Sequence, residues 1–159
     1  MKTADLGFAN LDLIRKQRTG APEAVFCQGK TSKQVGEIIK VLAEGEGNIF
    51  GTRATPEDFA ETKKLVPEAK YYEEARIIAV EKQKESEREG VIAVVTAGTA
   101  DIPVAEEAAV VAELLGNPVN RIYDVGVAGI HRLFERLEEI REARVIIAVA
   151  GMEGALPSV

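Results

Sequence analysis

Three stretches of the sequence combine small residues with side chains that bind anions or transfer protons. They are Thr96–Asp101, Asp124–His131 and Ala150–Pro157, and each follows a run of apolar residues. Their glycine and alanine residues allow backbone N–H groups to approach a ligand closely. Carboxylate, hydroxyl and imidazole groups beside such a backbone are suited to holding a phosphorylated small molecule and to moving a proton on it.

The catalytic candidates in these stretches are Asp101, His131 and Glu153. Imidazole has an ordinary pKa of about 6.5, which suits proton transfer near neutral pH. The binding candidates are glycines and short polar residues beside these three: Gly98, Thr99, Asp124, Gly126, Gly129, Gly151, Gly154 and Ser158. No metal ligand is predicted, and a metal requirement stays open.

Each catalytic candidate also has a structural alternative. Asp101 precedes Ile-Pro and is as typical of a helix cap as of a ligand site. His131 is near a predicted helix start, where histidines are more often structural than catalytic, and Glu153 would favour the dipole of a following helix. Cys27 stands among apolar residues and is predicted to be a buried, inert thiol.

The elements that must position these residues alternate along the second part of the chain. Apolar strands are expected at 91–98, 118–126 and 144–154, and helices at 103–116 and 130–143. Strands without polar alternation are buried on both faces, and the helices between them imply right-handed parallel crossovers. The pattern predicts half of a doubly wound α/β sheet, whose ligands bind beyond the carboxyl ends of the strands.

The helix spacing predicts which side chains face this sheet: Val104, Ala108, Val111 and Leu115 in the first helix, and Ile130, Leu133, Phe134 and Leu137 in the second. The sequence stops at Val159, where the next helix is expected. Leaving one apolar strand side chain uncovered costs ~1.5–3 kcal/mol. The sequence is therefore predicted to be a fragment, or to have its sheet completed by another chain.

The first part of the chain predicts a small α/β domain. A helical segment is expected at 11–18, followed by strands at 24–29, 48–54 and 75–80. Thr31 and Thr55 are predicted to cap the two helices between these strands. Residues 81–90 are charged and polar apart from a terminal glycine, which indicates a boundary. The predicted domains are residues 1–85 and 86–159.

Composition excludes several classes of partner. The net charge of −6 argues against nonspecific nucleic-acid binding, which requires a basic surface. No apolar run approaches the ~18 residues needed to span a membrane. The start of the chain lacks the apolar region of a signal peptide, and a single cysteine forms no internal disulfide, so a cytoplasmic location is predicted.

The three stretches are similar to loops of a known superfamily. The segments "TAGTAD", "AGIHR" and "AGMEGALPS" resemble the ligand loops of the PurE superfamily of aminoimidazole ribonucleotide carboxylases and mutases. The longer segments "RIYDVGVAGIHRL" and "VIIAVAGMEGALPSV" are closer to the LarB branch, as are "GKTSKQV" and "TRATPE" in the first domain. LarB is the carboxylase/hydrolase of nickel-pincer cofactor biosynthesis, and the resemblance covers nearly the whole chain.

The resemblance implies a PurE-like, flavodoxin-like fold of three layers with helices on both faces of a parallel sheet, incomplete in this chain. It also implies carboxylation of the pyridinium ring of nicotinic acid adenine dinucleotide and cleavage of its phosphoanhydride, giving AMP and a dicarboxylated mononucleotide. The co-substrate would be CO2 or bicarbonate, with no tightly bound cofactor. Family members form symmetric homo-oligomers, commonly octamers.

The resemblance also implies roles for residues. Gly98, Thr99 and Asp101 would hold the ribose phosphate or the incoming carboxylate. His131 would act as a general acid or base, and Glu153 would remove the ring proton after carboxylation.

Two departures from the family pattern bear on activity. Ala100 stands where the first loop often carries serine. The LarB branch continues beyond this sequence and places its nucleophilic cysteine in the later part, a role that Cys27 does not fill. This chain alone is therefore expected to be inactive. Two alternatives stay open: aminoimidazole ribonucleotide carboxylation, and a non-catalytic nucleotide-binding or regulatory module.

Overall fold

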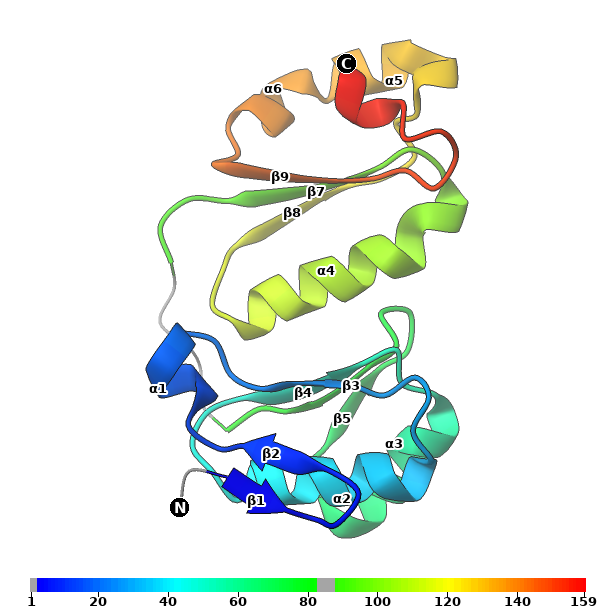
Figure 1. Ribbon diagram of the computed structural model, residues 1–159. Coiled ribbons are helices and arrows are strands. Elements are labelled where there is room, and N and C mark those ends of the chain that lie inside the picture. Colours follow the sequence, from blue (N-terminus) through cyan, green and yellow to red (C-terminus); the bar gives the residue numbers. More distant parts are fainter. Residues whose placement is uncertain (1–2, 83–87) are drawn as a thin grey trace. The chain divides into compact units, whose positions relative to one another are not determined.

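The computed structural model describes residues 3–82 and 88–159 (Figure 1). The chain forms two compact units, Met1–Lys84 and Glu85–Val159. The predicted domain boundary between residues 85 and 86 lies outside the described residues.

The first unit begins with a β hairpin. Strands β1 (Thr3–Asp5) and β2 (Asn10–Asp12) pair antiparallel, and the Asp5 carboxylate accepts a 2.7 Å hydrogen bond from the Gly7 N–H within the turn. A short helix, α1 (Arg15–Thr19), follows. The predicted helical segment at 11–18 was therefore wrong in its first half, because Leu11 is a buried strand residue of the core.

A four-stranded sheet forms the body of the first unit. Its strands are β3 (Ala24–Phe26), β4 (Ile49–Thr52), β5 (Lys70–Tyr72) and β6 (Ile77–Val80), in the order β3-β4-β6-β5. β3 and β4 are parallel, whereas β6 is antiparallel to both of its neighbours. The predicted strands are present. β5 was not predicted, because three half-exposed residues give too short a pattern.

Both helices of this unit start at the predicted caps. Helix α2 (Ser32–Ala43) begins with Thr31, whose hydroxyl accepts the Gln34 N–H at 3.3 Å. Helix α3 (Pro56–Leu65) begins with Thr55, whose hydroxyl accepts the Asp58 N–H at 3.2 Å. Each is a full capping box, which satisfies N–H groups that the first helical turn leaves unpaired.

The second unit is a three-layer α/β structure. Strands β7 (Ile92–Thr96), β8 (Val119–Ile122) and β9 (Val145–Val149) form a parallel sheet in the order β8-β7-β9. Helix α4 (Ile102–Leu114) covers one face, and helices α5 (Ile130–Glu135) and α6 (Leu137–Arg141) cover the other (Figure 1). The predicted fold class is confirmed.

Side chains of the central strand β7 enter both cores. Val94 packs against Ala105 and Ala109 of α4, whereas Ala93 and Val95 belong to the cluster on the opposite face. A strand buried in this way has no polar face, which is the reason that its sequence shows no alternation.

The predicted inner face of α4 was wrong. The structure buries Ala105, Ala109 and Val110 and leaves Val104 42% exposed. The helix is apolar almost all round, so residue spacing alone does not select the face that meets the sheet. The alanines decide it, because their small side chains let the helix axis approach the strands.

The predicted long helix over 130–143 is instead two short helices. The helical conformation is interrupted at Arg136, whose φ of −108° lies outside the helical range. Leu133 and Ile140 are buried, but Phe134, predicted to face inward, is 62% exposed. Because α5 and α6 are separate helices, the residues of 130–143 do not form one continuous apolar stripe facing the sheet.

The outer strand β9 is partly uncovered. Val145 is 48% exposed and Ile146 is 53% exposed. No helix in the described ranges 3–82 and 88–159 is long and apolar enough to cross a membrane.

A larger side chain on the buried face of α4 tests the orientation of this helix against the sheet. An Ala105→Leu change places three extra carbons against β7 and should destabilise the protein by about 1–3 kcal/mol. Val104→Leu, one position earlier and exposed, should change stability by less than about 0.5 kcal/mol. Urea unfolding followed by circular dichroism measures both, and a larger loss for Val104→Leu would contradict the observed orientation.

Candidate functional site

All the predicted site residues lie beyond the carboxyl ends of β7, β8 and β9. Parallel strands bring these ends to one edge of the sheet, and the register pairs Thr96 of β7 with Val149 of β9, so these two strands end level. The chain continues from β7 to β8 on one side and then to β9 on the other. This reversal makes the end of β7 the topological switch point, where open α/β sheets bind their ligands.

Asp101 ties the loop after β7 to the loop after β9. One carboxylate oxygen accepts the Gly98 N–H at 3.0 Å, and the other accepts the Gly151 N–H at 2.9 Å. Gly151 suits this contact, because a Cβ there would lie 3.1 Å from the carboxylate. Asp101 is not the capping residue of α4 itself, but its bond to the Gly98 N–H caps the start of the turn Thr99–Asp101 that leads directly into α4, which agrees with the helix-cap alternative in this form. The geometry gives Asp101 a positioning role, and its catalytic role stays a prediction.

A second connection joins the loops after β7 and β8. The buried Thr96 hydroxyl accepts the Asp124 N–H at 2.9 Å, and the Thr96 carbonyl accepts the Val125 N–H at 3.0 Å. Asp124 adopts a left-handed φ of +59°, which short polar side chains tolerate better than most. At Gly126 a Cβ would lie only 2.5 Å from the Ala97 carbonyl oxygen. The two loops therefore meet backbone to backbone, at a distance that only glycine allows.

Arg132 is a candidate binding residue that the sequence reasoning did not select. Its guanidinium donates a 2.6 Å hydrogen bond to the Asp124 carboxylate, which fixes a cation beside the loop after β8. The close approach of Gly129 supports the same placement, because a Cβ there would lie 2.7 Å from Arg132 Nε. A fixed guanidinium is a good partner for phosphate or carboxylate. The sequence signal that could have identified Arg132 is its position directly after His131, which was selected, in the first turn of α5.

His131, in the first turn of α5, and Glu153, on the loop after β9, are both exposed at this edge. Their side chains make no hydrogen bond or ion pair with the part of the chain that the structure describes, so both are open to a ligand. Glu153 has a left-handed φ of +58°, followed by Gly154 at +60°. A glutamate in this conformation is strained by about 1–3 kcal/mol, a pattern found at functional loops.

The remaining binding candidates lie on short turns of the same loops. Thr99 is exposed in the turn Thr99–Asp101 after β7, and Ser158 is exposed in the turn Leu156–Ser158 after β9. Among the described residues, no cluster of three or more His, Cys, Asp or Glu side chains could hold a metal ion.

Cys27 is the inert thiol that the sequence predicts. It is 1% exposed in the core of the first unit, and burial together with the Asp58 carboxylate raises its pKa to about 12. A neutral buried thiol does not act as a nucleophile.

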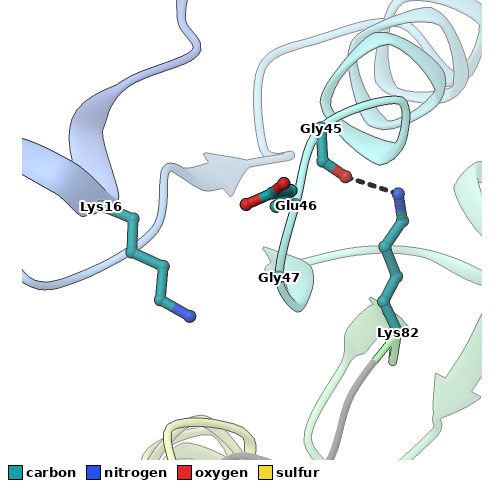
Figure 2. A pocket seen from close by; sticks show the side chains of 5 residues that line it. All are labelled: Lys16, Gly45, Glu46, Gly47 and Lys82. Atoms are coloured by element: carbon teal, nitrogen blue, oxygen red, sulfur yellow. Dashed lines mark hydrogen bonds between the residues drawn. The ribbon is translucent and has the colours of Figure 1, made fainter.

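A hollow of about 450 Å³ in the first unit is lined by Lys16, Gly45, Glu46, Gly47 and Lys82 (Figure 2). Lys82 donates to the carbonyl oxygens of Ala43 and Gly45, the latter at 2.6 Å, and so satisfies the end of α2. Figure 2 shows the Glu46 carboxylate between the two lysine side chains. Lys82 therefore has a structural role, and the Glu46 carboxylate disfavours the binding of an anion in this hollow.

Comparison with known proteins identifies the family. The model of the LarB/PurE-like N-terminal domain matches residues 3–83. The chain belongs to the LarB/PurE-like family. An uncharacterized protein of Methanocaldococcus jannaschii is 41% identical over 162 residues, covering 94% of this chain and 61% of the relative. This LarB/PurE-like chain thus spans about 61% of the length of the curated relative that it matches.

The close approach at Gly126 yields a test of the site's construction. Gly126→Ala should destabilise the protein by about 1–3 kcal/mol, because the new methyl group meets the Ala97 carbonyl. Gly98→Ala is the matched control in the neighbouring loop, since its nearest contact would be an ordinary 3.9 Å. Thermal unfolding compares the two, and equal melting temperatures would contradict the described packing.

The raised pKa of Cys27 yields a second test. Iodoacetamide at pH 8 should alkylate the folded chain at least about a hundred-fold more slowly than the chain unfolded in guanidinium. Mass spectrometry of timed samples measures both rates. Rapid alkylation of the folded chain would contradict the assignment of Cys27 as an inert thiol.

Proposed function

We propose that this chain supplies the nucleotide-binding and proton-transfer part of a carboxylase/hydrolase that acts on nicotinic acid adenine dinucleotide. The observation that carries the proposal is the single edge formed by three joined loops, with Asp101 and Asp124 engaged in holding it and His131 and Glu153 unengaged. Membership of the LarB/PurE-like family supports a carboxylase-type reaction at this edge.

The binding roles follow from the groups present. The Arg132 guanidinium and the hydroxyl of Thr99 hold phosphate oxygens of the dinucleotide, together with N–H groups of the glycine-rich loops. Asp101 keeps two of these loops at a fixed separation through Gly98 and Gly151. A ligand therefore meets donors that need little rearrangement, which lowers the cost of binding.

The carboxylation step forms a bond between a ring carbon and CO2. The pyridinium cation is electron-poor, so a thiolate first adds to the ring and converts it into an electron-rich dihydropyridine. The ring carbon then attacks CO2, Glu153 takes the proton from that carbon, and the returning electron pair expels the thiolate. Cys27 does not serve, because it is buried and its pKa is raised. The thiolate is that of the cysteine which the LarB branch places in its later part.

The hydrolysis step breaks the phosphoanhydride. Water attacks the phosphorus on the pyridinium side, the bond from that phosphorus to the bridging oxygen breaks, and AMP leaves with that oxygen, so that AMP and the mononucleotide each keep one phosphate. Arg132 neutralises charge that develops on the phosphoryl oxygens. His131 is placed to take the proton from the attacking water or to give one to the leaving phosphate.

The match of residues 3–83 to the LarB/PurE-like N-terminal domain favours the dinucleotide over aminoimidazole ribonucleotide as substrate. The ribonucleotide carboxylases of purine biosynthesis normally lack an additional domain of this kind. A non-catalytic nucleotide-binding module is the remaining alternative, and it predicts binding without turnover in the complete protein as well. The homo-oligomer and the cytoplasmic location stay predictions.

The role of Glu153 is tested by Glu153→Gln in a full-length family protein. Incorporation of labelled bicarbonate into the dinucleotide should fall by at least about a hundred-fold, because the amide does not accept the ring proton. Calorimetry should give dinucleotide affinity within about three-fold of the wild type, since Glu153 is not assigned to binding.

Glu135→Gln is the matched control, an exposed glutamate of α5 without an assigned role. It should leave both measurements unchanged. Turnover retained in Glu153→Gln would remove Glu153 from the mechanism, and binding without turnover in the wild type would favour the module.

A further inference from the structure

The carboxyl end of β8 is held by strand pairing on one side only. The order β8-β7-β9 makes β8 an outer strand, and its register with β7 ends at the pair Val95 and Ile122. Tyr123 and Asp124 follow beyond that pair, and Asp124 adopts a left-handed φ of +59°. Such a conformation persists only where its surroundings fix it. The loop in which Asp124 binds Arg132 therefore depends on contacts from outside the sheet.

Glu106 supplies such a contact from α4. Its Oε1 accepts a 2.6 Å hydrogen bond from the Tyr123 hydroxyl and a 2.9 Å hydrogen bond from Arg121 Nε. Arg121 and Tyr123 are two residues apart, so both lie on the face of β8 that meets α4. The Tyr123 ring also packs against the cluster that α4 forms with β7. One carboxylate thus joins the helix to the residue directly before Asp124.

The burial of Glu106 points to a geometric role. Its side chain is 15% exposed, whereas that of Glu113, which accepts two hydrogen bonds from the other side of the Arg121 guanidinium, is 42% exposed. Moving a carboxylate out of water costs free energy that pairing returns only in part, so a pair of this kind adds little stability compared with apolar packing. It does fix geometry, because its hydrogen bonds form only when the partners lie at these positions.

The start of α4 is also tied to the other two loops of the candidate site. Asp101, directly before the helix, accepts the N–H groups of Gly98 and Gly151, which belong to the loops after β7 and β9. Glu106 lies in the second turn of the same helix. Asp101 and Glu106 together therefore connect the start of α4 to all three strand ends.

We propose that Glu106 is a positioning residue of the candidate site. Through Tyr123 it fixes the loop after β8 relative to α4, and so holds Asp124 and the Arg132 guanidinium in place beside the loops that Asp101 joins. Glu106 acts on a ligand only through Arg132. The consequence for ligand binding rests on the proposed function, whereas the consequence for the loop does not.

The first experiment measures the loop in this chain by amide hydrogen exchange and NMR. Glu106→Ala should make the Asp124 and Val125 amides exchange about ten-fold faster, because the residue before them loses its anchor. Glu113→Ala is the matched control. It removes the other carboxylate from Arg121 but no contact of Tyr123, and should keep both rates within about two-fold of the wild type.

The Ala97 amide separates a local effect from a general loss of stability. It donates to the Val149 carbonyl, at the neighbouring end of β7 and β9, and has no contact with Glu106. Its exchange rate should stay within about two-fold of the wild type in both variants. A general loss of stability would speed this amide to the same degree as Asp124.

The second experiment measures turnover in a full-length family protein with the same residues at the matching positions. Glu106→Ala should raise the KM for the dinucleotide about ten-fold and keep the kcat of bicarbonate incorporation within about two-fold, because Arg132 is assigned to phosphate and not to the ring. Glu106→Gln retains an acceptor oxygen and should keep the KM within about three-fold. Tyr123→Phe removes only the hydroxyl and should raise the KM about five-fold.

Three outcomes would overturn the proposal: unchanged exchange at Asp124 in Glu106→Ala, equal effects of Glu106→Ala and Glu113→Ala, or an equal rise at Ala97. An unchanged KM despite faster exchange would overturn the role in binding. If Glu106→Ala does not fold, Tyr123→Phe decides by the same exchange measurement. A wild-type protein that does not turn over the dinucleotide would contradict the proposed function, and the exchange rates would then decide the role of Glu106.

Discussion

Parallel pairing of β7 with a strand on each side is the constraint on which the second unit depends. Because all three strands run in the same direction, their carboxyl ends meet at one edge, and every loop with chemical groups starts there. The same pairing buries β7 on both faces and requires helices on both sides of the sheet. The position of the candidate site and the layers of the fold thus have one cause.

The loops at this edge are held by hydrogen bonds that their backbone N–H groups donate to Asp101 and Thr96. The Asp101 carboxylate accepts N–H groups from two loops, and the Thr96 hydroxyl and carbonyl accept N–H groups from the third. Such an arrangement fixes the backbone and leaves other side chains unengaged. The contrast between the engaged Asp101 and the unengaged Glu153 separates a residue that builds the edge from one that is available for chemistry.

The family match and the candidate site lie in different units of the chain. The first carries the match that shows the family, over residues 3–83, yet the Lys82 side chain that lines its hollow is engaged with carbonyl oxygens at the end of α2. The second carries the loops with the chemical groups and the uncovered strand β9. An edge strand with Val145 and Ile146 exposed is a costly surface for a protein to leave open, since each buried aliphatic side chain contributes ~1.5–3 kcal/mol.

The sequence by itself determined the order of strands and helices in the second unit, the caps at Thr31 and Thr55, the buried thiol of Cys27 and the loops in which the site residues lie. These follow from local signals: apolar runs, capping boxes and glycine-rich turns. It did not determine the hairpin of β1 and β2, the short strand β5 or the face of α4, because short strands and a helix that is apolar almost all round carry no periodic signal. The exposed Phe134 was missed because one long helix was predicted where the structure has the two short helices α5 and α6. Only the tertiary structure assigned Asp101 to two backbone N–H groups and Arg132 to Asp124. Those contacts join residues from separate loops, and the spacing of residues along one chain does not state which loops will meet.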